Sequence, residues 1–165
     1  MAINTYWATT RTTDRPGQDT SYQGALLYNG DRYGMTAEHL FVDAEFAPAV
    51  GFVRRDDFRK SQGSARFSPR PRGIAAVRQF VWGGSVDYVE SVAGQVESRI
   101  AQANFQTVFE NSDRVTADFQ QSYEFLERPF NIVSDVTIPV DGYDFRDTYL
   151  AYSAGAQRRV SGTFF

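Results

Sequence analysis

Apolar and polar residues alternate one by one along several stretches of this chain, and this alternation limits its fold more than any other feature. Between Arg114 and Phe125, the odd positions from 115 onward are apolar except for Gln121, and the even positions are polar. Residues 32–42, 80–88 and 100–109 carry similar apolar sets at every second position. Successive side chains of a β-strand point to opposite faces. Because strong helical periodicity is absent, the pattern predicts an all-β fold.

We predict a single domain over residues 1–165, built as an antiparallel up-and-down meander of about nine long strands. The predicted strands are 3–11, 20–28, 32–42, 63–68, 75–89, 96–110, 114–127, 142–153 and 157–165. Most have about the 9–11 residues, or more, that a tilted strand needs to cross a bilayer, whereas soluble strands most often have about 5–6. The strand lengths therefore favour a segment of an outer-membrane-type β-barrel.

The connections between these strands are expected to alternate in length. The longer ones are 12–19, 43–62, 91–95 and 128–141, and the shorter ones are 29–31, 69–74, 111–113 and 154–156. Outer-membrane barrels have short periplasmic turns at one rim and longer extracellular loops at the other. The alternation is thus a second sign of a membrane barrel, independent of strand length.

The residue types on the two predicted faces also suit a membrane barrel. The polar faces carry mostly Gln, Asn, Thr, Ser and Asp, as a water-filled lumen would. Aromatic residues crowd near strand ends, as in interfacial girdles: Tyr22, Tyr28, Tyr33, Phe41, Tyr88, Phe109, Tyr123, Phe125, Tyr143 and Phe145. A soluble antiparallel barrel or sandwich is the alternative, and it would have a charged outer face around one apolar core.

Composition excludes several classes of site. The chain has no cysteine and a single histidine, so disulfide scaffolds, thiolate metal sites and histidine clusters are ruled out. A net charge of −3 gives no support to a nucleic-acid partner, and the glycines show no phosphate-loop or dinucleotide spacing. We predict no cofactor and no metal. The first residues already have a strand pattern without a signal peptide, so we expect a fragment of a larger protein.

The densest run of charge lies at residues 54–60, and we take part of it as a candidate interaction site at a rim or in a loop. Its members are Arg54, Arg55, Asp56, Asp57 and Arg59. Arginines at the outer rim could pair with lipid phosphates or fold a loop across a pore. The adjacent aspartates partly neutralise them, which disfavours a nucleic-acid site.

No catalytic residues are predicted. His39 is in register with an apolar strand face near a strand end, which fits an interfacial imidazole better than a catalytic triad. The carboxylates Asp56 and Asp57, and the group Asp141, Asp144 and Asp147, fit loop charges or lumen ion pairs better than the paired carboxylates of a glycosidase.

Several stretches of the chain resemble a known family. They are Asp31–Gly34, Ala37–Leu40, Phe46–Phe58, Ala65–Pro71, Asn111–Arg114 and Pro129–Phe145, and the most specific part is the Gly-Phe-Val-Arg-Arg-Asp-Asp-Phe sequence at Gly51–Phe58. The chain is similar here to the C-terminal barrel region of bacterial envelope proteins of unknown function that carry an N-terminal family-nine-like carbohydrate-binding module. The resemblance covers most of the chain.

The resemblance implies a β-barrel segment in the cell outer membrane of a Gram-negative bacterium, acting as a channel, anchor or scaffold. Outer-membrane lipid is the expected partner, and carbohydrate is a second one through the N-terminal module, which lies outside this sequence. The alternatives are part of a carbohydrate-active or other hydrolytic envelope enzyme, with a site built from loop carboxylates, and a soluble β-sheet binding module. As an isolated segment, the sheet is expected to stay open, so that its first and last strands do not pair with each other.

Overall fold

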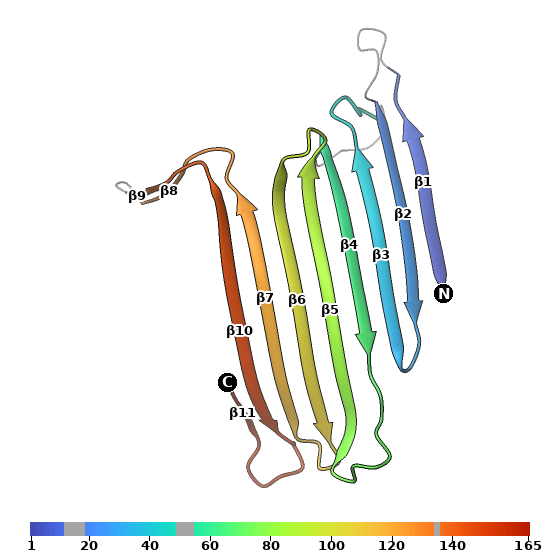
Figure 1. Cartoon of the computed structure of the whole chain (residues 1–165), viewed down its shortest axis with the longest axis vertical. Helices are drawn as coiled ribbons and strands as arrows, with labels where there is room; N and C mark the ends of the chain where they lie inside the picture. Colours follow the sequence, from blue (N-terminus) through green and yellow to red (C-terminus); the bar gives the residue numbers. More distant parts are fainter. Residues whose placement is uncertain (12–18, 49–54, 134–135) are drawn as a thin grey trace.

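A nine-stranded antiparallel sheet makes up most of the computed structural model, which describes residues 1–11, 19–48, 55–133 and 136–165 (Figure 1). The strands of the sheet are β1 (Ala2–Thr9), β2 (Thr20–Asn29), β3 (Tyr33–Val42), β4 (Phe58–Phe67), β5 (Val77–Ser91), β6 (Val96–Phe109), β7 (Arg114–Phe125), β10 (Gly142–Ala154) and β11 (Gly162–Phe164). Each strand pairs with the next one along the chain, apart from a separate hairpin of β8 (Phe130–Val133) and β9 (Val136–Ile138). The predicted all-β up-and-down meander is confirmed.

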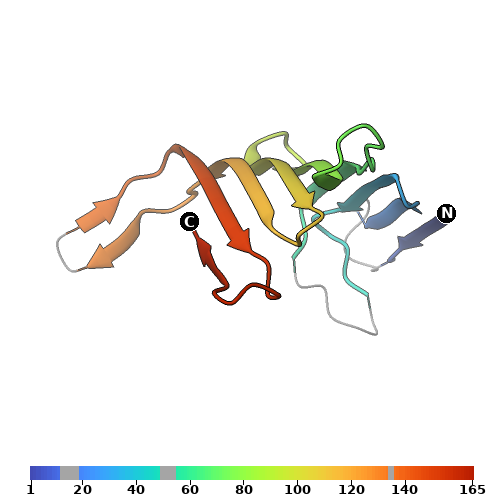
Figure 2. The same ribbon diagram turned by 90° about the horizontal axis from the view of Figure 1, so that it is seen from below.

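The sheet is open. In the described part of the chain, β1 pairs only with β2, and β11 pairs only with the end of β10. Figure 2 shows a curved layer with β1 at one side and β10 at the other. The prediction that the first and last strands do not pair with each other is confirmed.

The strand register gathers the alternating residues onto two distinct faces. Residues directly opposite each other in an antiparallel pair point to the same side. One row of opposed residues, on what we term the apolar face, runs Tyr28, Met35, Ala65, Gly84, Ala103, Phe119 and Thr148. A row on the other side, the polar face, runs Leu27, Thr36, Ser64, Ser85, Gln102, Gln120 and Asp147. The predicted segregation of faces is therefore seen on β2 to β7, whereas β10 carries polar and apolar residues on both faces.

The fourth strand begins earlier than predicted. We expected a loop up to residue 62, but β4 starts at Phe58 and pairs with β3 and β5 along its whole length. Arg59 and Lys60, near the start of β4, lie on opposite faces and are both charged, so this part of the strand shows no alternation of apolar and polar residues. Their charges are matched by β5, since Arg59 pairs with Glu90 at 3.4 Å and Lys60 with Asp87 at 3.1 Å.

Two predictions in the C-terminal third are wrong in detail. The segment 128–141 is not a plain connection, because it contains the β8–β9 hairpin. The last predicted strand, 157–165, is mostly a turn, and only Gly162–Phe164 pairs with β10. Hydrogen bonds from this turn to Asp113, described below, hold residues 155–158 out of the sheet.

The connections lie at two rims, which we name from Figure 1. The described parts of the connections at the upper rim are 10–11, 19, 43–48, 55–57, 92–95 and 126–141 without 134–135, and the lower rim carries 30–32, 68–76, 110–113 and 155–161. The predicted alternation in length is only partly correct. The connection after β5 is a tight turn, in which Gly94 (φ 90°) donates its N–H to the Ser91 carbonyl at 2.9 Å, and 68–76 is longer than expected.

The sheet has almost no interior of its own. Among the residues that the structure describes, the buried apolar side chains are Val42, Val77 and Val89. The accessible surface is 11796 Å², whereas a compact globular monomer of 18.6 kDa would expose about 8,200 Å². Both faces of the single layer are therefore exposed.

Candidate functional site

Two bands of aromatic side chains cross the apolar face. The upper band consists of Trp7, Tyr22, Phe41, Tyr88 and Tyr123, and the lower band consists of Tyr28, Tyr33, Phe67, Phe80, Trp82 and Phe105. Neighbouring rings touch across the strands: Tyr22 and Phe41 have ring centroids 4.9 Å apart, and Phe67 and Trp82 have theirs 5.7 Å apart. Ring contacts of this kind link β1 to β3 in the upper band and β3 to β6 in the lower band.

The two bands are separated by a distance close to that of a membrane interior. Along β3 they lie at Phe41 and Tyr33, a separation of about 27 Å at the usual rise of a strand. If the strands are tilted by about 40°, this projects to about 21 Å, near the apolar band of about 25 Å on outer-membrane barrels. Between the bands the face is aliphatic or small on β2 to β6, with Leu26, Ala37, Gly63, Val86 and Ala101 in one row, and this row continues through Gln121 on β7 to Arg146 on β10.

Not every predicted girdle residue lies in these bands. Tyr143 and Phe145 are opposite Glu124 and Ser122, so they lie on the polar face. Strand β10 is mixed on both faces, with Asp144 and other polar residues on its apolar-face side. The alternation that identified the other girdle positions is too weak here to assign a face.

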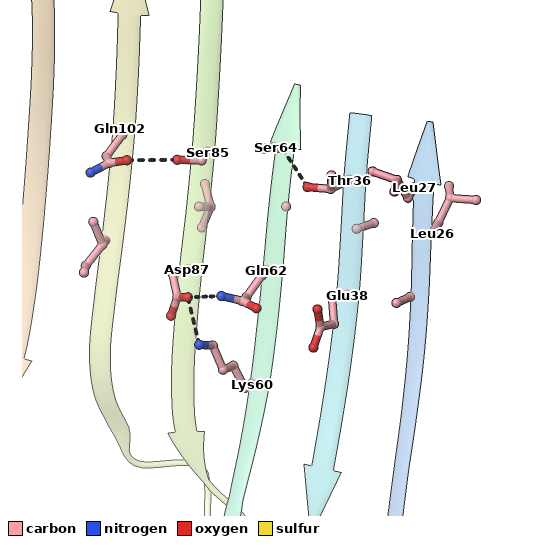
Figure 3. Close-up of a pocket in the computed structure, with 15 residues that line it drawn as sticks. Leu26, Leu27, Thr36, Glu38, Lys60, Gln62, Ser64, Ser85, Asp87 and Gln102 are labelled. Carbon is pink, nitrogen blue, oxygen red and sulfur yellow. Dashed lines mark hydrogen bonds and ion pairs between the residues drawn. The ribbon is translucent and has the colours of Figure 1, made fainter. Parts of the chain in front are cut away.

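The polar face carries a ladder of hydrogen bonds between strands. Thr36 and Ser64 hydroxyls lie 2.6 Å apart, Ser85 donates to Gln102 at 3.2 Å, and Gln102 donates to Gln120 at 2.5 Å. In Figure 3, Lys60 and Gln62 of β4 both reach Asp87 of β5, with the ammonium 3.1 Å from the carboxylate. These side chains line a hollow of about 760 Å³ that runs across β2 to β6.

The predicted charged site is divided by the structure. Arg54 lies outside the described residues. Arg55 forms an ion pair with Glu97 and lies over the ring of Phe58 at 5.4 Å. Arg59 donates to Glu90 at 3.4 Å and to the Val92 carbonyl at 3.3 Å, and it lies over the ring of Phe41 at 5.8 Å. Both guanidinium groups are therefore engaged with neighbouring strands.

The two acidic members of that site are exposed at the upper rim. Asp56 and Asp57 precede β4, and Asp57 has a positive φ of 55°. A binding role for Arg54, Arg55, Asp56, Asp57 and Arg59 stays a prediction.

The other candidate groups are also separated. His39 lies on the apolar face as expected, with Nδ1 2.9 Å from the Ser61 hydroxyl and its ring 5.9 Å from that of Tyr22. Asp144 and Asp147 lie on opposite faces of β10, and Asp141 lies in the connection before it. In the described ranges, no cluster of three or more histidine or acidic side chains could hold a metal ion.

Sequence reasoning missed a polar junction at the lower rim. Asp113, only 4% exposed, accepts hydrogen bonds from the Gly155 backbone N–H at 2.9 Å, from the Tyr152 hydroxyl at 2.7 Å and from Arg158 Nε at 2.9 Å. These donors, the backbone N–H first, lower the pKa of Asp113 from 3.8 to about 2. No local pattern marks this junction, because its residues are distant in sequence.

A second junction ties the β2–β3 turn to the connection 68–76. Arg70 donates to both carboxylate oxygens of Asp31, at 2.5 and 2.9 Å, and this pairing lowers the pKa of Asp31. The buried Ser68 donates its hydroxyl to the Asp31 carbonyl at 3.0 Å, and Arg66 donates to the Gly30 carbonyl at 2.7 Å. The lower rim is thus fixed by side-chain hydrogen bonds.

No family model, curated protein or solved structure matches the chain. The described ranges contain no helix that is long and apolar enough to cross a bilayer.

Proposed function

We propose that this chain is a segment of a β-barrel in the outer membrane of a Gram-negative bacterium, with its apolar face toward lipid and its polar face toward a water-filled lumen. The observation that carries the proposal is the pair of aromatic bands on the apolar face, which lie eight residues, or about 27 Å, apart along β3. Aromatic side chains with one polar end prefer the boundary between hydrocarbon and water.

The exposure of the apolar face supports a lipid environment. Large side chains on this face are open to solvent, with Trp7 70% and Leu150 64% exposed. An apolar surface of this extent is unfavourable in water and marks an interface with another apolar phase. In the proposed orientation, lipid tails cover it.

The polar face suits water for a different reason. Its amides and hydroxyls pair across the strands, as Ser85 and Gln102 do, and these two side chains also line the hollow of about 760 Å³. A wet lumen satisfies such groups, whereas hydrocarbon does not.

The open edges require further strands in this proposal. The outer edge of β1 and most of the outer edge of β10 have no strand partner among the described residues. Hydrocarbon cannot satisfy unpaired backbone N–H and C=O groups. We therefore propose that the barrel is completed by strands beyond this segment, and that the whole acts as a channel, an anchor or a scaffold for a carbohydrate-binding module.

The hydrolytic alternative lacks a specific observation in its favour. Asp144 and Asp147 lie on opposite faces of the sheet, and Asp87 is already engaged by Lys60 and Gln62. A glycosidase needs two carboxylates that flank one bond.

Single cysteines test the proposed orientation, because the natural chain has none. Spin labels at Ala101, Ala103, Gln102 and Asn104, in the full-length protein that contains this segment, reconstituted in phosphatidylcholine vesicles with any cysteine outside the segment replaced by serine, report contact with lipid or water. We expect labels at 101 and 103 to collide preferentially with oxygen, which is concentrated in lipid, and labels at 102 and 104 with a water-soluble nickel chelate. Equal accessibility at all four positions, or the reverse pattern, would contradict the proposal.

A further inference from the structure

A shallow groove crosses the apolar face between the two aromatic bands. Its floor consists of small residues on four adjacent strands, and its sides include Met35, Val86 and Phe119. The floor residues are Ala37, Gly63, Ala65, Gly84, Ala101 and Ala103. The groove has a volume of about 670 Å³. Because these residues lack long side chains, the face is hollowed where the rest of it is filled.

Charge on the apolar face is confined to the end of the strands nearer the upper rim. The charged residues on the described strands of this face are Arg59, Glu90, Arg99, Asp144 and Arg146. The rows from Met35 to the lower rim contain none of them. A molecule lying along this face therefore meets cations at one end only.

Of the three arginines on this face, Arg99 and Arg146 make no hydrogen bond with another described residue. Arg59 is bound by Glu90 and the Val92 carbonyl. The guanidinium of Arg99 lies over the ring of Tyr123 at 5.8 Å, and it approaches Asp144 only to 3.9 Å, beyond hydrogen-bond distance. Arg146 is exposed and makes no hydrogen bond or ion pair with another described residue.

These two arginines stand at the edge of the groove. Ala101 on the groove floor is opposite Gln121, which also lines the groove, and Gln121 is in turn opposite Arg146. Arg99 is two residues before Ala101 on the same strand and face. Asp144 is the carboxylate that faces this corner, so the arginines leave a net positive charge there.

We propose that the groove and this corner form a binding site for one phospholipid with a net negative charge, with an acyl chain along the groove and the phosphate held by Arg99 and Arg146. The proposal rests on the lipid-facing orientation proposed above. A guanidinium offers a planar set of donors that matches phosphate oxygens, and it stays charged at any relevant pH. Charge complementarity at one end and an apolar groove beyond it fit an anionic lipid rather than a free anion.

Trp82 provides a direct readout. It lies on the apolar face two residues before Gly84 of the groove floor. The chain has two tryptophans, so a Trp7→Phe background leaves Trp82 as the single fluorophore. Bromine atoms on acyl chains quench tryptophan on contact. The full-length protein that contains this segment, with any tryptophan outside the segment also replaced by phenylalanine, is reconstituted in phosphatidylcholine vesicles that contain either brominated phosphatidic acid or brominated phosphatidylcholine.

We expect brominated phosphatidic acid to quench Trp82 at a lower mole fraction than brominated phosphatidylcholine does. The expected preference is up to about 25-fold, because a basic side chain near an anionic lipid contributes about fivefold in affinity. The single variant Arg146→Gln, which removes no internal contact, is expected to lower the preference about fivefold. The double variant Arg99→Gln with Arg146→Gln is expected to abolish it.

Two further variants separate the parts of the site. Arg114→Gln removes an exposed arginine from the polar face and is the matched control, so the preference is expected to persist. Ala103→Leu fills the groove floor and is expected to reduce quenching by phosphatidic acid even with both arginines present. An unchanged preference in Ala103→Leu would overturn the assignment of the groove to the site.

The outcomes distinguish this proposal from the proposed function. If neither brominated lipid quenches Trp82, the apolar face does not contact lipid and both proposals fail. If both lipids quench equally, or if Arg146→Gln and Arg114→Gln behave alike, the lipid-facing orientation stands and the binding site is refuted. Millimolar inorganic phosphate is expected to leave the preference unchanged, and its loss would identify a free-anion site instead.

Discussion

Asp113, in the turn between β6 and β7, accepts a hydrogen bond of 2.9 Å from the backbone N–H of Gly155, 42 residues later in the chain. The same carboxylate binds Arg158. A buried acceptor thus joins two neighbouring connections of the lower rim. Gly155 has no room for a side chain here, since a Cβ would lie 2.7 Å from the Asn111 carbonyl oxygen.

We expect Asp113→Ala to destabilise the lower rim. The change leaves the Gly155 N–H and the Arg158 guanidinium without their acceptor in a closely packed corner. Urea unfolding of the chain in detergent, followed by tryptophan fluorescence, measures the loss. Asp118→Ala is the control, because the side chain of Asp118 lies on the polar face without a hydrogen bond to another described residue. Equal destabilisation by both variants would contradict the role of the junction.

The same junction predicts a dependence of stability on acid. The pKa of Asp113 is lowered from 3.8 to about 2 in the folded chain. A lowered pKa means that the folded state favours the ionised form of Asp113. The stabilisation that ionised Asp113 gives to the folded state is therefore complete above about pH 4 and is lost as the pH falls toward 2. The urea midpoint of the wild-type chain is therefore expected to approach that of Asp113→Asn over this range. If the urea midpoints of the wild-type chain and of Asp113→Asn differed by the same amount at pH 5 and at pH 2, this role of ionised Asp113 would be contradicted.

Arginine substitutions separate the lipid-facing side from the lumen side. Ala103 and Phe119 are opposite each other on the apolar face, and an arginine at either position is expected to cost about 2–4 kcal/mol, the range for a cation at the bilayer midplane. Arginine at Asn104 or Gln120, on the polar face, is expected to cost far less. Unfolding of the lipid-reconstituted chain gives these values. Similar losses on both faces would refute the assignment of the lipid side.

The two rims are expected to differ in accessibility on intact cells that express the full-length protein. A cysteine at Ala44, in the upper-rim connection 43–57, is expected to react with a bulky membrane-impermeant reagent. A cysteine at Arg32, in the lower-rim turn 30–32, is expected to react only after the outer membrane is permeabilised. Both side chains are exposed, so a difference in labelling reflects topology rather than burial. Equal labelling before permeabilisation would disprove the orientation.

The faces of the sheet could be predicted from the sequence because alternation is a local property. In β7, for example, Asp118 lies directly between Ala117 and Phe119, and the pleat alone sends it to the opposite side of the sheet from both of them. The start of β4 could not be predicted in this way. Arg59 and Lys60 are both charged, and the carboxylates that balance them, Glu90 and Asp87, belong to the next strand.

The sites depended on contacts that are distant in sequence. The groove exists because Ala37, Gly63, Gly84 and Ala101 fall close together on adjacent strands, and register between strands is not visible in any one of them. The turn at 155–161 replaces a predicted strand because Asp113 holds Gly155 and Arg158. By contrast, the charged run at Arg55 and Arg59 is conspicuous in the sequence, yet both guanidinium groups already have acidic partners within the sheet.

The separation of the two aromatic bands has a consequence for the choice of membrane. The register fixes the bands, at Phe41 and Tyr33 on β3, along the strands, so the sheet cannot adapt to a bilayer of another thickness without tilting or exposing hydrophobic surface. A band of about 21 Å is shorter than the roughly 30 Å of an average hydrocarbon core and closer to the thinner outer membrane of bacteria. Hydrophobic mismatch would then favour short-chain lipids around this sheet, and lipid thickness itself would contribute to where the protein resides.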